Sequence, residues 1–129
     1  MVKEKHMREI EEDFHFLRDK ILALLIFGSR VKKEEHEKSD YDICIVKPDS
    51  RKIIREVFRK IDVKKKNYDV HIFEDLPLYI KMEIIKNHKV VFSKDIYGLY
   101  EYFYFYRKLW KDQERRNKMD KKDLLKILK

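Results

Sequence analysis

Three aspartates and one glycine-serine step are the residues of this chain whose types and spacing could do chemistry. Gly28-Ser29 ends an apolar run, and ten residues separate Ser29 from Asp40. A glycine lets the backbone approach a phosphate closely, and a serine hydroxyl with the following amides can donate hydrogen bonds to phosphate oxygens. An ordinary strand-ending turn is the commoner explanation of a Gly-Ser dipeptide taken alone.

Asp40 and Asp42 enter the next apolar run of the sequence. Side chains alternate along a strand, so these two would project from one face, about 6 to 7 Å apart. Two such carboxylates repel each other unless a divalent cation neutralises them, and Mg²⁺ prefers a couple of carboxylates together with phosphate oxygens. The pair therefore indicates a metal-nucleotide site. A polar loop leading into the strand is an equally good explanation of the pair by itself.

Asp69 lies inside a third apolar run, between Tyr68 and Val70. A carboxylate within a strand needs a partner that offsets its desolvation. If the second and third strands are neighbours, Asp69 could join Asp40 and Asp42, either as a metal ligand or as the group that takes the proton from an attacking hydroxyl. The alternative is an edge-strand aspartate paired with a lysine. His71 shares the predicted face of Asp69, and an ordinary strand histidine is favoured there.

These residues must be positioned by alternating strands and helices, which predict an α/β fold with a small sheet. Apolar runs and alternation predict strands over residues 21–27, 41–46, 68–73 and 89–92. Helical spacing predicts helices over residues 7–20, 51–61, 78–87, 97–118 and 121–129. Residues 30–38 are polar enough for a solvated helix or a loop, and Asn87-His88 is expected to turn.

Composition excludes several classes of protein. The 129 residues predict one domain over residues 1–129, and 43% hydrophobic with 43% charged residues suits one core under an ionic surface. Cys44 is the only cysteine, which excludes an intramolecular disulfide and a thiolate metal cage. No apolar run approaches the roughly 20 residues that span a bilayer, and no secretory signal is present. We therefore expect no membrane contact and a cytoplasmic location.

The C-terminal region combines aromatic and basic residues. A helical stripe of four residues favours core packing, with three tyrosines beside it: Leu99, Phe103, Tyr106 and Trp110, then Tyr97, Tyr100 and Tyr104. Residues 107–129 carry ten basic and four acidic side chains, and the whole chain has a net charge of +8. A solvated face is the simple explanation of these charges, and docking of a partner is their preferred functional use. RNA binding is a less favoured use. The sequence leaves open whether the chain forms a homo-oligomer.

Taken together, residues 26–29, 40–43 and 68–70 carry a family resemblance. Ile-Phe-Gly-Ser, then Asp-Tyr-Asp-Ile after ten residues, and later Tyr-Asp-Val resemble the polymerase-beta-type nucleotidyltransferase superfamily. The chain is most similar there to the minimal nucleotidyltransferases of prokaryotes, the MntA-like antitoxins encoded beside HEPN-domain toxins. The motif core spans residues 21–73. The resemblance implies a small mixed sheet flanked by helices, with a helical C-terminal extension over residues 97–129.

The resemblance also implies an activity and its residues. Gly28 and Ser29 would hold the triphosphate with help from Arg30, Asp40 and Asp42 would bind two Mg²⁺ ions, and Asp69 would be the third catalytic carboxylate and metal ligand. ATP would donate AMP to a hydroxyl, namely a tyrosine of a HEPN toxin partner. The alternative function is a catalytically inactive antitoxin, or an RNA- or protein-binding module that acts through the basic C-terminal helix.

Overall fold

The computed structural model describes residues 4–28 and 40–128, and it describes side chains within residues 5–28 and 40–117. A four-stranded sheet lies at its centre, in the order β3-β2-β1-β4. Its strands are β1 (Ala23–Phe27), β2 (Tyr41–Val46), β3 (Tyr68–Ile72) and β4 (His88–Ser93). The α-helices are α1 (Glu4–Asp13), α2 (Ile53–Lys60), α3 (Leu78–Lys86) and α4 (Ile96–Leu128), and two short 3₁₀ helices are η1 (His15–Leu17) and η2 (Phe73–Asp75).

The sheet is mixed. β2 and β3 run parallel and are joined through α2, whereas β1 pairs antiparallel with both β2 and β4. A parallel pair needs a crossover connection, which the helix supplies, while antiparallel neighbours do not. The predicted α/β class, a small mixed sheet flanked by helices, is confirmed, and the strand predicted over residues 41–46 has the predicted bounds.

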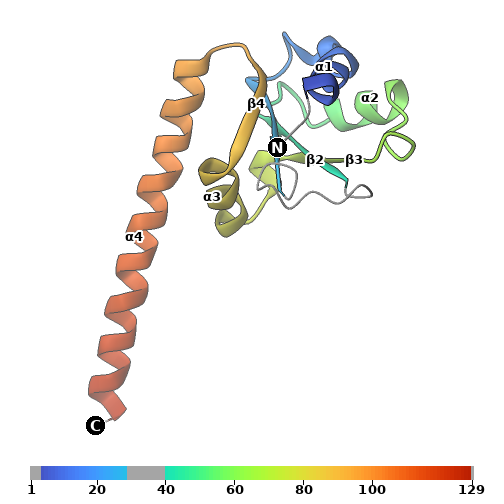
Figure 1. Cartoon of the computed structure of the whole chain (residues 1–129). Coiled ribbons are helices and arrows are strands. Elements are labelled where there is room, and N and C mark those ends of the chain that lie inside the picture. The colour runs from blue at the N-terminus through green and yellow to red at the C-terminus, as the bar shows by residue number, and fades with distance from the viewer. Residues whose placement is uncertain (1–3, 29–39, 129) are drawn as a thin grey trace.

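Each face of the sheet is covered by its own pair of helices (Figure 1). On one face, Ile10 and Phe14 from the N-terminal region and Val57 from α2 pack against Ile43 and Ile45 of β2. On the other face, the core combines residues of the two C-terminal helices with residues of β1 and β2: Ile84, Ile85, Leu99 and Phe103 with Ala23, Leu25 and Cys44. Residues of β2 therefore alternate between two apolar layers, so the face of each side chain is fixed by its position.

Two helix predictions are wrong in extent. The helix predicted over residues 7–20 ends at Asp13, and a 3₁₀ turn follows in which the Leu17 amide donates to the Phe14 carbonyl at 3.0 Å. The apolar spacing of three from Phe14 to Leu17 suits such a turn as well as an α-helix. At the other end, the two helices predicted over residues 97–118 and 121–129 are one helix, α4. No glycine or proline occurs after Gly98, so nothing in the sequence stops it.

The predicted turn at Asn87-His88 is wrong at its second residue. His88 already belongs to β4 and pairs with Phe27. Its Nδ1 atom lies 2.8 Å from the Ile84 carbonyl oxygen at the end of α3. The imidazole thereby satisfies a terminal carbonyl of the helix, so the chain passes from α3 to β4 with little intervening turn.

α4 is the longest element, with 33 residues. Figure 1 shows its first part beside the sheet and α3, and its C-terminal part extending away from them. At about 1.5 Å per residue the helix is roughly 50 Å long. No helix in the described part of the chain is long and apolar enough to cross a membrane.

Candidate active site

Asp42 and Asp69 lie side by side on the parallel strands β2 and β3. The two residues are direct register partners, as are Cys44 and His71 two positions further. Because neighbouring strands are about 4.8 Å apart, in-register side chains on one face come close together. Asp42, Asp69 and His71 each offer a ligand atom, and these three atoms lie within 4.8 Å of one another. This is the one group of three potential metal-ligating side chains in the described residues.

His71 completes this group, although the sequence favours an ordinary strand histidine over a position near the metals. Its Nε2 atom lies 3.1 Å from Asp69 Oδ2, and its ring lies 5.8 Å from the Phe27 ring, centroid to centroid. The alternation of β3 had placed His71 on the face of Asp69, and an ordinary strand histidine was favoured nonetheless. The missing information was the strand order, since only the neighbour β2 brings a second carboxylate to this position.

The carboxyl group of Asp42 is in a strongly anionic environment. Burial raises its pKa, and so do the charge of Asp69, the charge of Asp40 and a hydrogen bond with Asp69, whereas the charge of His71 lowers it. The net pKa lies above the usual value, so among the described residues burial and the neighbouring carboxylates outweigh the charge of His71. A divalent cation would offset this excess of negative charge, and two carboxylates are donors that Mg²⁺ accepts. The donor set therefore fits a metal ion.

Asp40 is placed differently from the other two aspartates. It precedes the first residue of β2, its side chain is exposed, and it lies outside the group of three ligand atoms. Its charge nevertheless contributes to the raised pKa of Asp42. Asp40 is thus near enough to Asp42 to act on the site electrostatically.

Gly28 directly follows β1 and lies against the carboxylate of Asp42. Its φ angle is +83°, and a Cβ atom built there would lie 2.2 Å from Asp42 Oδ2. A side chain at this position would therefore both strain the backbone and displace the carboxylate. The close approach that the sequence suggested for this glycine is made to an aspartate. Ser29, Arg30 and the polar stretch 30–38 lie outside the described residues.

The site lies on the sheet face that α3 and α4 cover. Asp42 alternates with Ile43 and shares its face with Cys44, which belongs to the core layer beneath those helices. Burial, with the charge of Glu74, raises the pKa of the Cys44 thiol well above its usual range. Cys44 is therefore an apolar neighbour of the site and no nucleophile.

A glycine bend, two in-register carboxylates and a histidine on a mixed sheet define an anionic site suited to a metal and a phosphorylated substrate. Residues 10–97 match the family described as "Polymerase beta, Nucleotidyltransferase". The chain belongs to this family, and the predicted nucleotidyltransferase class is confirmed.

Individual proteins are similar to this chain in sequence or in fold. Over 97 residues the chain is 50% identical to a protein of Methanocaldococcus jannaschii named "Putative protein adenylyltransferase", and the match covers 75% of each chain. A chain in the crystal structure of a toxin-antitoxin complex with AMP-PNP has a TM-score of 0.69 at 15% identity, over 92% of this chain and 98% of that one. A chain in a complex of tri-AMPylated Shewanella oneidensis HEPN toxin with MNT antitoxin has a TM-score of 0.64 at 11% identity, over 92% and 95%. These two structures share the fold.

Proposed function

We propose that this protein transfers AMP from ATP to a hydroxyl group of a partner protein, with Mg²⁺ as cofactor, and that the acceptor is a tyrosine of a HEPN-type toxin. Residues 1–129 would form a single minimal nucleotidyltransferase domain. The observation that carries the proposal is the in-register pair Asp42 and Asp69 with atoms within 4.8 Å of each other and of His71.

The relatives support the acceptor class. The Methanocaldococcus relative is named for protein adenylylation, and the Shewanella structure contains an AMPylated toxin beside its antitoxin. The chain itself supports a donor with a polyphosphate, because the clustered carboxylates of Asp42 and Asp69 suit a metal ion, and such an ion would in turn bind a triphosphate.

The carboxylates of Asp40, Asp42 and Asp69 are proposed to hold two Mg²⁺ ions, with Asp42 and Asp69 as the pair that lies closest together. When bound, the ions supply positive charge against the triphosphate and the leaving group. The acceptor hydroxyl oxygen bonds to the α-phosphorus, the bond to the β-phosphate oxygen breaks, and pyrophosphate leaves. Asp69, proposed as the third catalytic carboxylate, accepts the hydroxyl proton. Gly28, Ser29 and Arg30 are proposed to hold the triphosphate.

The test is transfer of labelled AMP from ATP, in the presence of Mg²⁺, to a purified HEPN-type toxin, for which the protein encoded beside this gene is the first to be tried. Asp42→Asn should lower transfer by about 1000-fold, since losing a metal ligand removes several kcal/mol of charge stabilisation and each 1.4 kcal/mol is tenfold. Asp49→Asn is the matched control, because Asp49 is exposed beyond the far end of β2. Transfer that persists in Asp42→Asn would contradict the metal assignment.

A second candidate is a catalytically inactive antitoxin or RNA-binding module that acts through α4. The observation that favours it is the exposed basic surface of this helix, which includes Arg115 and Arg116. This candidate predicts full inhibition of the toxin after Asp40→Asn with Asp42→Asn, and loss of inhibition after Arg115→Glu with Arg116→Glu. The transfer mechanism predicts the reverse pattern.

A further inference from the structure

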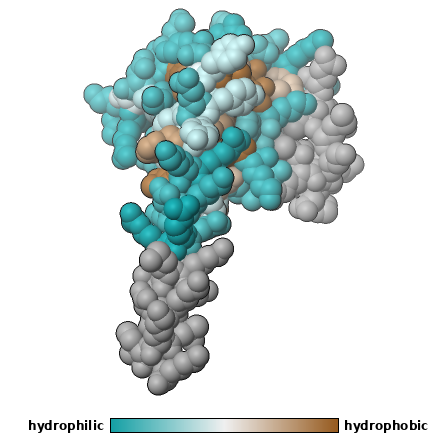
Figure 2. Space-filling view, turned by 90° about the vertical axis from the view of Figure 1, so that its left-hand side faces the viewer, coloured by the Kyte–Doolittle hydropathy of each residue, from teal (hydrophilic) through white to brown (hydrophobic). Residues whose placement is uncertain are grey.

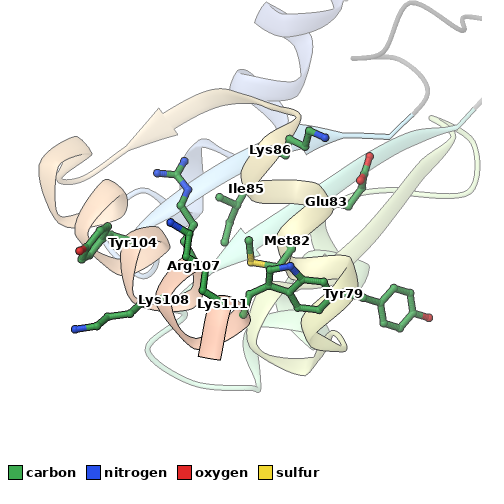
Figure 3. A pocket seen from close by; sticks show the side chains of 10 residues that line it. Tyr79, Met82, Glu83, Ile85, Lys86, Tyr104, Arg107, Lys108 and Lys111 are labelled. Atoms are coloured by element: carbon green, nitrogen blue, oxygen red, sulfur yellow. The ribbon is translucent and has the colours of Figure 1, made fainter. Parts of the chain in front are cut away.

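A groove of about 800 Å³ runs between α3 and α4, separate from the carboxylate site. Figure 3 shows side chains from both helices turned toward it. Ten residues line it: Tyr79, Met82, Glu83, Ile85, Lys86, Tyr104, Arg107, Lys108, Trp110 and Lys111. The groove is thus built from α3, along its whole length, and the middle of α4.

The floor of the groove is apolar, although its edges are open to solvent. Ile85 is buried, Met82 and Trp110 are partly exposed, and Tyr79 and Tyr104 stand at 64% and 63% exposure. A monomer gains nothing by holding large aromatic side chains in water, so such a cluster commonly marks a contact surface. Core packing, predicted for the aromatic stripe, holds for Leu99 and Phe103, whereas Trp110 lies in the groove.

The edges of the groove are strongly basic. Lys86, Arg107, Lys108 and Lys111 line it with a single carboxylate, Glu83. Figure 2 looks onto α4 and shows the surface becoming strongly hydrophilic where the helix leaves the body of the molecule. A complementary occupant therefore carries apolar side chains on one face and acidic side chains beside them.

We propose that this groove binds an acidic amphipathic helix of the protein that receives the nucleotide. This inference rests on the proposed function. A trough between two helices suits a third helix, which would place an apolar stripe on Met82, Ile85 and Trp110. The basic edges then face the acidic side chains of that helix.

The charges argue against other occupants. A second copy of this chain has a net charge of +8 and would bring another basic helix to a basic groove. RNA would match the charge, but a phosphate backbone makes no use of an aliphatic floor, and the carboxylate of Glu83 would face it. An amphipathic acidic helix satisfies both the floor and the edges.

The groove and the carboxylates lie on the same side of the sheet. Ile85, which lines the groove, belongs to the same core layer as Cys44, and Cys44 shares a face of β2 with Asp42. A partner held between α3 and α4 is therefore held on the catalytic face. Docking here would bring a hydroxyl of that partner near the site without an additional acceptor-binding domain.

The test measures binding of the full-length chain, by isothermal titration calorimetry, to the same purified HEPN-type protein that is tested as the acceptor. Trp110→Ala should weaken the Kd at least about tenfold, as expected for an aromatic anchor. Lys108→Glu with Lys111→Glu should weaken it similarly, and these exposed positions should leave folding intact. The matched controls are Tyr97→Ala and Arg115→Glu, which lie on α4 outside the groove.

The outcomes separate this inference from the proposed function. The Asp42→Asn variant should bind the partner with unchanged Kd while losing transfer. Binding at the groove is therefore measured independently of whether AMP is transferred. A photo-crosslinker at Tyr104 should label an acidic helix of the partner. The inference is overturned by groove variants that bind like the controls, by absence of binding in the wild type, or by groove-dependent binding of a single-stranded RNA oligonucleotide without binding of the protein.

Discussion

At the scale of single residues, the site is organised around the carboxylate of Asp42. Gly28 lies against this carboxylate, Asp69 is its register partner on the neighbouring strand, and the charge of Asp40 acts on it. The position combines partial burial with like charge, an arrangement that folding alone would not favour. Functional sites commonly carry such a cost, which a bound cation relieves.

The unfavourable negative charge of Asp42 predicts that a neutral side chain at this position stabilises the protein, by an amount that depends on pH. Because the folded state raises the pKa of Asp42, its ionised form destabilises the fold at neutral pH. Asp42→Asn should raise the free energy of unfolding by about 1 kcal/mol at about pH 7 without divalent cations. The gain should fade as the pH is lowered through the raised pKa, where wild-type Asp42 takes up a proton. Urea denaturation of the wild type and of Asp42→Asn, at about pH 7 and at a pH below the raised pKa, measures this gain, with Asp49→Asn as control. Equal free energies of unfolding at neutral pH would contradict the prediction.

The contact between Gly28 and Asp42 predicts coupled effects of substitution. Gly28→Ala should destabilise the protein by about 2 kcal/mol and reduce transfer strongly, because its methyl group would meet Asp42 Oδ2 at a backbone φ of +83°. In a double-mutant cycle with Asp42→Ala, the loss of stability from Gly28→Ala should shrink, leaving only the backbone strain. Strictly additive free energies of unfolding would show that the clash with the carboxylate does not matter.

At the scale of elements, the long helix α4 begins at a well-formed cap. The Gly98 amide donates to Asp95 Oδ1 at 3.1 Å, and the Leu99 amide donates to the Asp95 carbonyl at 3.0 Å. The Asp95 amide in turn donates to Ser93 Oγ, which ties the cap to the end of β4. The cap thus fixes the point at which α4 begins after β4.

Removing this cap should cost measurable stability. Asp95→Ala should lower the free energy of unfolding by about 1 kcal/mol, the usual cost of losing an N-cap side chain. Asp112→Ala removes the same group from an exposed position within α4 and should change stability by less than about 0.5 kcal/mol. Chemical denaturation compares the two variants, and equal losses would argue against a capping role for Asp95.

The elements also show how far the sequence could predict the molecule. Alternation and the apolar runs predict β2 with its full bounds and place Asp42 and Asp69 on strands. The pairing of those strands had to be assumed, because no local pattern states which strands are neighbours. The roles of Gly28 and His71 depend on the contacts across strands, so the sequence alone could suggest a glycine but not its partner.

At the scale of the whole molecule, the described surface of α4 changes along its length. Leu99 and Phe103 are buried, Trp110 is partly exposed, and residues 111–117 are exposed. Within the residues whose side chains are described, the helix therefore contributes to the core through its first part.

Truncation tests this division of the helix. A chain that ends after Asn117 should keep its free energy of unfolding within about 0.5 kcal/mol of the full chain, because residues 111–117 are already exposed and the helix has left the core before its cut end. A chain that ends after Glu101 loses Phe103, which is fully buried, and should be destabilised by at least about 3 kcal/mol. Thermal and urea unfolding of the three chains give the comparison. A large loss on the shorter truncation would mean that the end of α4 supports the fold.

The in-register pairing of β2 with β3 has a consequence for how the chain reaches its native state. A slip of one residue between these strands would turn Asp69 toward the hydrocarbon layer under α1 and α2, in place of Tyr68 or Val70. Burying a carboxylate there is strongly unfavourable, so the in-register pairing is favoured over a slipped one. The carboxylates of the candidate site therefore also help to specify the alignment of the strands that carry them.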